Sequence, residues 1–251
     1  MKKILVVLII LVAVYIIFSM KNKEDQNQTK NTILPVITTV EHASFVMNWG
    51  GVTIYNDPVG EASLYASSPP PDIILLSDIH GDHFNLETLS TLVGENTKLI
   101  APEAVAEKLE GAILEKTEVL KNGQVSVDRG FTIEAIPMYN LPESLDAYHT
   151  RGRGNGYLVE GGGVRVYIAG DTADIPEMRA LEDIDIAFIP MNLPYTMDIE
   201  TASSVVLEFI PKIVIPYHYR GPNGLSDVAK FKSLVNERNP AIEVLLLDWY
   251  K

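Results

Sequence analysis

The succession of short strand-like runs after residue 35 constrains the fold more than any other feature of the sequence. The runs "VITTV", "SFVMNW" and "VTIYND" lie close together, and "WGG" between the last two is typical of a turn, which predicts an antiparallel meander. Later runs such as "DIILLS" and "KIVIPYH" are apolar almost throughout and predict strands buried on both faces. The remaining strand-like runs are KLIAP (98–102), FTIEAIP (131–137), GYLVE (156–160), VRVYIAGD (164–171), DIAFIP (185–190) and EVLLLD (243–248).

Helical patterns separate some of these strands. They cover residues 86–93, 102–109, 175–181, 199–210 and 225–236. The strands outnumber those that one doubly wound sheet requires. We therefore expect an α+β fold in which two mixed sheets pack face to face with helices outside, because this arrangement buries alternating and continuous apolar strands alike. A chain of 251 residues fits one large domain.

The N-terminus reads as a targeting segment. An uncharged apolar run from Ile4 to Met20 follows "MKK", and a polar linker covers residues 21–34. The run is shorter than the ~20 residues of a typical membrane span but longer than most signal-peptide cores. It has no small-x-small cleavage site, which favours a retained anchor and leaves a cleaved signal as the alternative. Lys2 and Lys3 favour a cytoplasmic N-terminus, so the domain over residues 35–251 is expected outside the cytoplasm, membrane-anchored or exported.

The charge and the absence of cysteine exclude several classes of function. A formal net charge of −13 disfavours binding to nucleic-acid phosphates and to bare anionic lipid, so no nucleic-acid partner is expected. Because the chain has no cysteine, it can form neither a disulfide nor a thiolate metal site, and it has no Cys nucleophile. Any metal ion must be held by histidines and carboxylates.

The stretch "SDIHGDHFN" behind the apolar strand "DIILL" concentrates metal-capable side chains. Asp78 and His80 are two residues apart, so in an extended loop they project to the same side. Asp82 and His83 follow at the threshold of a helix that Asn85 can cap. Ligands in such sheets gather where strands end. We interpret the four side chains as a metal-binding loop rather than a solvated polar turn.

Three further residues occupy comparable positions in the sequence. His149 precedes the Gly-rich "RGRGNG", Asp171 ends the strand "VRVYIAG", and His218 follows the strand "KIVIPY". Each lies at or beside a strand end. Two divalent cations that share a carboxylate account for this distribution with the fewest assumptions.

With these motifs in view, the chain resembles the metallo-β-lactamase fold superfamily of dinuclear metallohydrolases over residues 36–251. The family signature His-x-His-x-Asp-His corresponds to Asp78-Ile79-His80-Gly81-Asp82-His83, with Asp in place of the first His. The resemblance implies a four-layer αββα sandwich and a defined ligand set. In that set Asp78, His80 and His149 hold one metal, Asp82, His83 and His218 hold the other, and Asp171 bridges the two.

Two shorter motifs extend the resemblance. Asp57 in "YNDP" is similar to the family's early aspartate, which braces the ligand loop from outside the metal shell. The stretch "EHASFVMNWGG" resembles the "GHAS" opening of the branch that includes ascorbate-6-phosphate lactonase and N-acylphosphatidylethanolamine phospholipase D.

Because position 78 carries a carboxylate, the identity and the number of the metal ions stay open. Asp78 makes the first site harder and more anionic than a histidine does, so Mn or Fe becomes an alternative to Zn. It also leaves open an enzyme that works with one metal, although two are expected.

The expected chemistry is hydrolysis by a metal-activated hydroxide. A divalent cation lowers the pKa of bound water toward ~7, and Asp82 is the candidate for carrying protons to the leaving group. Arg151 and Arg153 are candidates for binding an anionic substrate group, with solvated loop arginines as the alternative. Tyr219 and His42 are candidates for lining the pocket, with core packing for one of Tyr217 and Tyr219 and a structural role for His42 as alternatives.

Lactone, ester and phosphodiester bonds all suit this chemistry, in a small-molecule or lipid-like substrate. The alternative is a membrane-tethered, non-catalytic module that binds a metal or ligand on the same fold.

Overall fold

The computed structural model describes residues 32–250. The predicted N-terminal segment and most of the linker lie outside the described residues. From Ile33 onward the chain forms one compact unit. Within residues 32–250, no helix is both long enough and apolar enough to cross a membrane.

The first sheet contains the predicted meander, which is confirmed. Strands β1, β2 and β3 pair antiparallel, with Phe45 opposite Thr39 on one side and Asn56 on the other. Strands β4, β5 and β6 then add in parallel, in the order β1-β2-β3-β4-β5-β6. The strand bounds are Val36–Glu41, Ser44–Trp49, Val52–Asn56, Ile73–Leu75, Lys98–Ala101 and Thr117–Val119. Short helices connect them: η1 Ala62–Tyr65, α2 Leu86–Leu92, α3 Glu103–Ala106 and α4 Gly111–Glu115.

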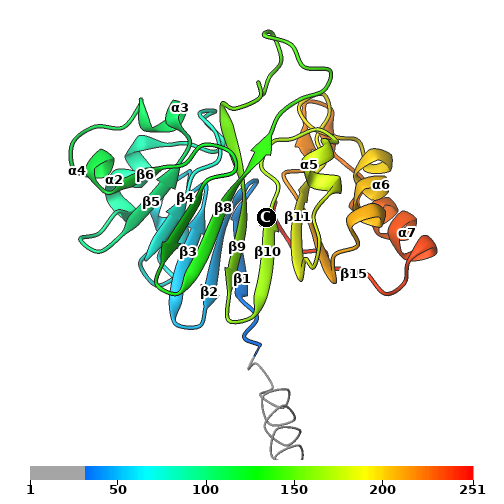
Figure 1. The fold of residues 1–251 in the computed structure, drawn as a ribbon, viewed down its shortest axis with the longest axis horizontal. Helices are drawn as coiled ribbons and strands as arrows, with labels where there is room; N and C mark the ends of the chain where they lie inside the picture. The colour runs from blue at the N-terminus through cyan, green and yellow to red at the C-terminus, as the bar shows by residue number, and fades with distance from the viewer. Residues whose placement is uncertain (1–31, 251) are drawn as a thin grey trace, which may run out of the picture. The chain divides into compact units, whose positions relative to one another are not determined.

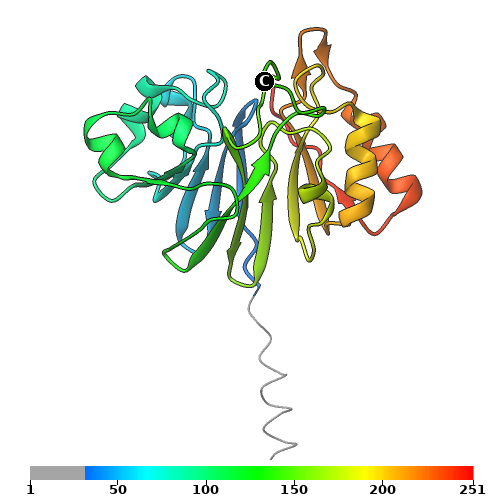
Figure 2. The same ribbon diagram turned by 45° about the horizontal axis from the view of Figure 1, so that its top comes forward.

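The second sheet repeats this plan with strand order β15-β12-β11-β10-β9-β8-β7. Strands β7 to β10 pair antiparallel, while β10, β11, β12 and β15 are parallel. The strand bounds are Val125–Asp128, Phe131–Met138, Gly154–Gly161, Val164–Ile168, Ile186–Pro190, Ile213–Tyr217 and Glu243–Val244. Helices α5 Pro176–Arg179, α6 Ile199–Phe209 and α7 Val228–Arg238 follow β10, β11 and β12. A separate hairpin joins β13 (Arg220–Gly221) to β14 (Gly224–Leu225) and stands at the upper edge of Figure 2 in orange.

The two mixed sheets and their helices form an αββα sandwich. Figure 1 shows α2, α3 and α4 on one flank and α5, α6 and α7 on the other, with the strands between them. Phe45 of β2 stacks on Phe188 of β11, with ring centroids 4.2 Å apart, and Trp249 packs edge-on against both. This aromatic cluster holds the sheets together.

Strand β4 in the first sheet is buried on both faces, as its continuous apolar run predicts. Ile73 and Leu75 of β4 belong to the core between the sheets, whereas Ile74 and the following Leu76 pack toward helix α2 and its neighbours. The strand alternates between two cores because successive side chains point to opposite faces. The loop after β4 therefore leaves a rigid, fully packed strand.

Several elements differ from the expectation. The run predicted as a strand over residues 243–248 pairs only at Glu243–Val244. The C-terminal helix begins at Val228 rather than at residue 225, because Asp227 caps it by accepting from the Lys230 amide. The helices expected over 102–109 and 175–181 are single turns. Strands β6 and β7, helix α4 and the β13–β14 hairpin were not predicted.

A glycine in β9 lets this strand lie close to the chain segment that leads to the predicted ligand Asp171. A Cβ on Gly156 of β9 would lie 2.7 Å from the Ala169 carbonyl oxygen and 2.9 Å from that of Ile168. No side chain fits there. The absence of a side chain lets β9 approach the end of β10 immediately before Asp171.

Candidate metal centre

The predicted ligands converge from both sheets. The segment from Asp78 to His83 follows β4, Asp171 follows β10, His218 follows β12, and His149 lies in the β8–β9 loop. The carboxyl ends of these parallel strands meet at one edge of the sandwich, where such sheets place their ligands. Asn85 accepts a hydrogen bond from the Thr88 amide and caps α2, as predicted.

Asp57 holds the ligand loop in place through Ser77 and His83. Its Oδ1 accepts from the Ser77 amide at 2.7 Å, and its Oδ2 accepts from Ser77 Oγ at 2.6 Å. The same Oδ2 lies 2.8 Å from His83 Nδ1. A His ring held through Nδ1 presents Nε2 as its ligand atom. Asp57 itself has a left-handed φ of 41°, an uncommon backbone conformation.

His83, Asp171 and His218 form the most buried cluster. His83 Nε2 lies 3.2 Å from Asp171 Oδ2, and His218 Nε2 lies 3.4 Å from Asp171 Oδ1. The two imidazole rings stack with an interplanar angle of 12°. All three side chains are almost completely buried. They can hold a divalent cation through two nitrogens and one carboxylate.

The electrostatics of this cluster are those of a cation site. Burial alone would lower the pKa of His83, but the carboxylates of Asp171 and Asp57 raise it well above its usual value. Burial alone would raise the pKa of Asp171, but the rings of His218 and His83 bring it well below its usual value. Without a metal, a proton therefore remains on His83. A bound cation would take the place of that proton.

Two observations test whether a metal fits. The Nε2 atoms of His83 and His218 lie 3.1 Å apart. At this separation both nitrogen lone pairs can be directed at one metal ion. Asp171 Oδ1 and His149 Nε2 are buried without a hydrogen-bond partner among the described residues. Buried polar atoms are otherwise nearly always paired. The donor set and its unpaired atoms therefore fit a divalent cation.

Asp78, His80 and His149 form a second cluster beside the first. His80 Nδ1 lies 2.8 Å from Asp78 Oδ2, and His149 Nε2 lies 3.8 Å from the same oxygen. His149 Nε2 is also 3.2 Å from Asp171 Oδ2. Asp171 thus contacts histidines of both clusters.

Asp82, His42 and Tyr250 form a chain of contacts at the solvent side of the centre. Asp82 Oδ2 lies 3.3 Å from His42 Nε2 and 3.4 Å from His218 Nε2. His42 Nδ1 lies 2.8 Å from the Tyr250 hydroxyl, which already accepts from the amides of Tyr219 and Arg220. The hydroxyl therefore donates its proton to Nδ1, and Nε2 of a neutral His42 carries the proton that faces Asp82. In this tautomer His42 orients Asp82. Together with His218, the two side chains also lie close enough to hold a metal ion.

The pKa directions agree with this assignment. Burial lowers the pKa of His42, so the ring is neutral. Burial would raise the pKa of Asp82, but contacts with His218 and His42 lower it, and the carboxylate is ionised. Burial raises the pKa of Tyr250 to about 12, which keeps its proton in place for donation.

The structure places the two candidate arginines differently. Arg153 donates to both oxygens of Asp78, from Nε to Oδ1 at 3.1 Å and from Nη2 to Oδ2 at 3.0 Å. Arg151 pairs instead with Glu143 and Glu177 and lies over the Tyr139 ring. Both guanidinium groups already have carboxylate partners.

Both candidate tyrosines are buried. Tyr219 packs edge-on against Tyr250, with ring centroids 4.9 Å apart. The Tyr217 hydroxyl accepts from the Gly170 amide at 2.8 Å, which is the core role that strand alternation favours for one of the pair. Tyr250 was not predicted as a site residue, because it belongs to no recognisable motif.

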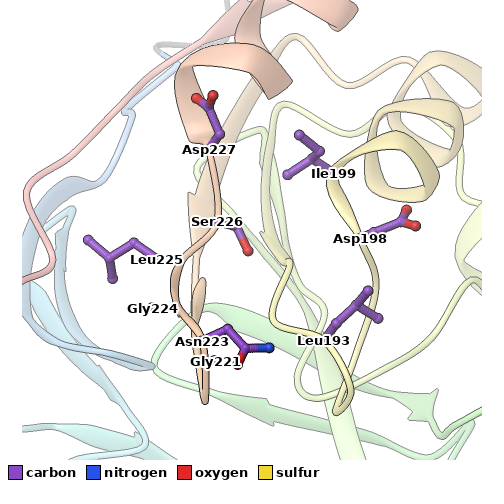
Figure 3. Close-up of a pocket in the computed structure, with 9 residues that line it drawn as sticks. All are labelled: Leu193, Asp198, Ile199, Gly221, Asn223, Gly224, Leu225, Ser226 and Asp227. Carbon is purple, nitrogen blue, oxygen red and sulfur yellow. The ribbon is translucent and has the colours of Figure 1, made fainter.

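Two cavities lie near this edge of the fold. One of about 270 Å³ lies between His149 and the loop over residues 140–145. Another of about 240 Å³ is formed by the β13–β14 hairpin with Leu193, the start of α6 and the two residues that precede α7 (Figure 3). No predicted site residue lines the second cavity. The metal clusters themselves open to solvent through Asp82 and His80, whose side chains are 45% and 40% exposed.

Comparison with known proteins gives consistent matches. The beta-lactamase superfamily domain matches residues 36–218. A UPF0173 metal-dependent hydrolase from Pyrococcus furiosus is 30% identical over 215 residues, which cover 80% of this chain and 92% of the relative. Another from Methanopyrus kandleri is 27% identical over 222 residues, which cover 84% of this chain and 96% of the relative.

Solved structures show the same fold. A candidate metal-dependent hydrolase from Parabacteroides distasonis is 39% identical, with a TM-score of 0.75, and the match covers 84% of this chain and 92% of that one. A metallo hydrolase from Ignicoccus hospitalis has a TM-score of 0.72 at 23% identity, covering 88% and 97% of the two chains, and supports the fold alone.

Proposed function

The chain belongs to the beta-lactamase superfamily domain family and to its UPF0173 metal-dependent hydrolases, and on this basis we propose that it hydrolyses ester, lactone or phosphodiester bonds with two divalent cations. One observation carries the proposal. His83, His149 and His218 each place Nε2 within 3.4 Å of the Asp171 carboxylate at a solvent-accessible edge of the sandwich.

The side chains have distinct roles in this proposal. Bound divalent cations lower the pKa of water and polarise the oxygen of a carbonyl or phosphoryl group. Asp82, His83 and His218 would hold one cation, Asp78, His80 and His149 would hold the other, and Asp171 would contact both. Zinc suits the imidazole-rich set, while Asp78 makes manganese or iron an alternative.

Asp82 is the proposed proton carrier. Its side chain is half-exposed, whereas Asp78 and Asp171 are buried. A carboxylate at the mouth of the site can take a proton from an attacking water and pass it to the leaving group. The neutral His42, held by Tyr250, keeps one oxygen of Asp82 oriented through its Nε2 proton. The open mouth favours catalysis over a non-catalytic module, because a structural metal site closes its coordination.

The proposed substrate class is supported by a sequence motif and not by the geometry of the site. The resemblance of "EHASFVMNWGG" to the branch with ascorbate-6-phosphate lactonase and N-acylphosphatidylethanolamine phospholipase D supports lactones and phosphodiesters. We expect the zinc-loaded protein to hydrolyse at least one member of a panel of lactones, aryl esters and bis-aryl phosphodiesters. Turnover should stop in excess chelator and return with zinc. Equal rates in the metal-loaded and chelated samples throughout the panel would contradict the proposal.

We also propose that the apolar run from Ile4 to Met20 tethers the enzyme to a membrane, with the catalytic domain outside the cytoplasm. This run lies outside the described residues, and its composition alone supports the proposal. Cells that express the full chain should retain it in the membrane fraction, whereas a chain that starts at Lys30 should not sediment. Equal solubility of the two chains would argue against an anchor. Tethering near a bilayer raises the effective concentration of lipid-like substrates.

A further inference from the structure

We propose that Arg153 makes the two metal positions unequal, so that the site of Asp78, His80 and His149 binds its cation more weakly than the site of His83, Asp171 and His218. This inference rests on the proposed function and concerns how its metal centre is loaded. It assigns to Arg153 a role as a positioning residue that controls occupancy of the first site.

The contacts of Asp78 carry the inference. Its side chain is fully buried, and both carboxylate oxygens accept from Arg153, at 3.1 Å from Nε and 3.0 Å from Nη2. Nη2 of Arg153 also lies 3.5 Å from His80 Nε2. A cation entering this cluster must share its only buried carboxylate, apart from the bridging Asp171, with a permanent positive charge. Arg cannot lose that charge by deprotonation.

The other site lacks such a competitor. Among residues 32–250, the carboxylates of Asp57, Asp82 and Asp171 form ion pairs with histidines only. Within the described part of the chain, no lysine or arginine pairs with any of these three carboxylates. The negative charge of this site is therefore fully available to a metal.

The backbone fixes Arg153 in this position. The next residue, Gly154, has no room for a side chain, since a Cβ there would lie 2.8 Å from the Ser77 carbonyl oxygen. The Asn155 amide donates to the same oxygen at 2.9 Å. The start of β9 is thus joined to the residue that precedes Asp78. The arginine side chain is only 20% exposed, so water screens its charge weakly.

A competing role for Arg153 predicts the opposite effect. Partners of metal ligands commonly orient them, and their loss weakens metal binding about 10- to 100-fold. If Arg153 serves mainly to orient Asp78, its removal will lower the affinity of the first site. If its charge competes with the metal, removal will raise the affinity.

Zinc titration of the full-length protein against a chromophoric chelator distinguishes the two roles. We expect the parent to bind one equivalent tightly and a second at least about tenfold more weakly. Arg153→Met should tighten the weaker equivalent about tenfold or more and leave the tighter one unchanged. Arg153→Lys, which keeps the charge but cannot form the two-bond fork, should bind as weakly as the parent. Arg151→Met is the matched control, because its guanidinium pairs with Glu143 and Glu177, and it should change neither affinity.

Two results would overturn the inference: equal affinities for both equivalents in the parent, or a weaker second equivalent in Arg153→Met. Should Arg153→Met fail to fold, the two affinities of the parent and those of Arg153→Lys still test the role of Arg153. The readout is metal binding, so it stands whether or not a substrate is found. Failure of the hydrolysis screen would therefore count against the proposed function and not against the role of Arg153.

Discussion

An Asp171→Ala variant is expected to lose metal and hydrolytic activity together. Asp171 contacts His83, His149 and His218, and it is the only carboxylate with an oxygen within 3.4 Å of all three rings among the described residues. Its removal takes away the one carboxylate, among the described residues, that all three imidazoles contact. Because loss of a ligand's hydrogen-bond partner already costs about 10- to 100-fold in metal affinity, loss of the bridging ligand should cost at least about 100-fold.

Metal content by mass spectrometry and turnover on the best substrate of the panel measure this effect. Asp174→Ala serves as the control, because Asp174 pairs with Arg179 and has no contact with the clusters. The control should keep its metal and its rate. Circular dichroism should show that Asp171→Ala retains its secondary structure. Two bound metals per chain in Asp171→Ala would contradict the bridging assignment.

Removal of metal is expected to lower the free energy of unfolding by about 4 kcal/mol when free zinc in the loaded sample is 1,000 times the dissociation constant. Only the folded chain gathers these side chains, so binding stabilises it by mass action. For a domain of this size the corresponding fall in the midpoint of thermal unfolding is about 8 to 16 °C.

Differential scanning calorimetry with zinc and with chelator measures the shift. In Asp171→Ala the two midpoints should nearly coincide, since that variant has lost the site. The metal-free parent should still unfold cooperatively, because both hydrophobic cores are complete without the centre. An unchanged midpoint in the parent after verified metal removal would mean that the clusters do not bind metal with useful affinity.

The strand-like runs predict most of the fold, because a strand that is buried on both faces is apolar at nearly every position. "DIILLS" alternates between two cores, as its apolar composition requires. Strands β6 and β7 escaped prediction, since they are three and four residues long and are only partly buried. The run over residues 243–248 is apolar but pairs only briefly: Glu243 and Val244 are in register with β12, and the Leu245 amide donates one further bond to Val214.

The candidate metal ligands were predictable for a related reason. Polar residues directly behind buried strands must lie at the edge where parallel strands end, so Asp78, Asp171 and His218 could be named together. The partners of these ligands could not. The pairing of Arg153 with Asp78 and of Tyr250 with His42 depends on how loops far apart in the chain pack, 75 and 208 residues away.

The most direct test of the metal centre is a crystal of the full-length protein grown with zinc and measured at the zinc absorption edge. We expect a strong anomalous peak about 2.0–2.1 Å from Nε2 of both His83 and His218 and in contact with the Asp171 carboxylate. We also expect a second, weaker peak beside Asp78, His80 and His149. An absence of anomalous density at His83 and His218, with zinc bound elsewhere or not at all, would contradict the assignment of the metal centre.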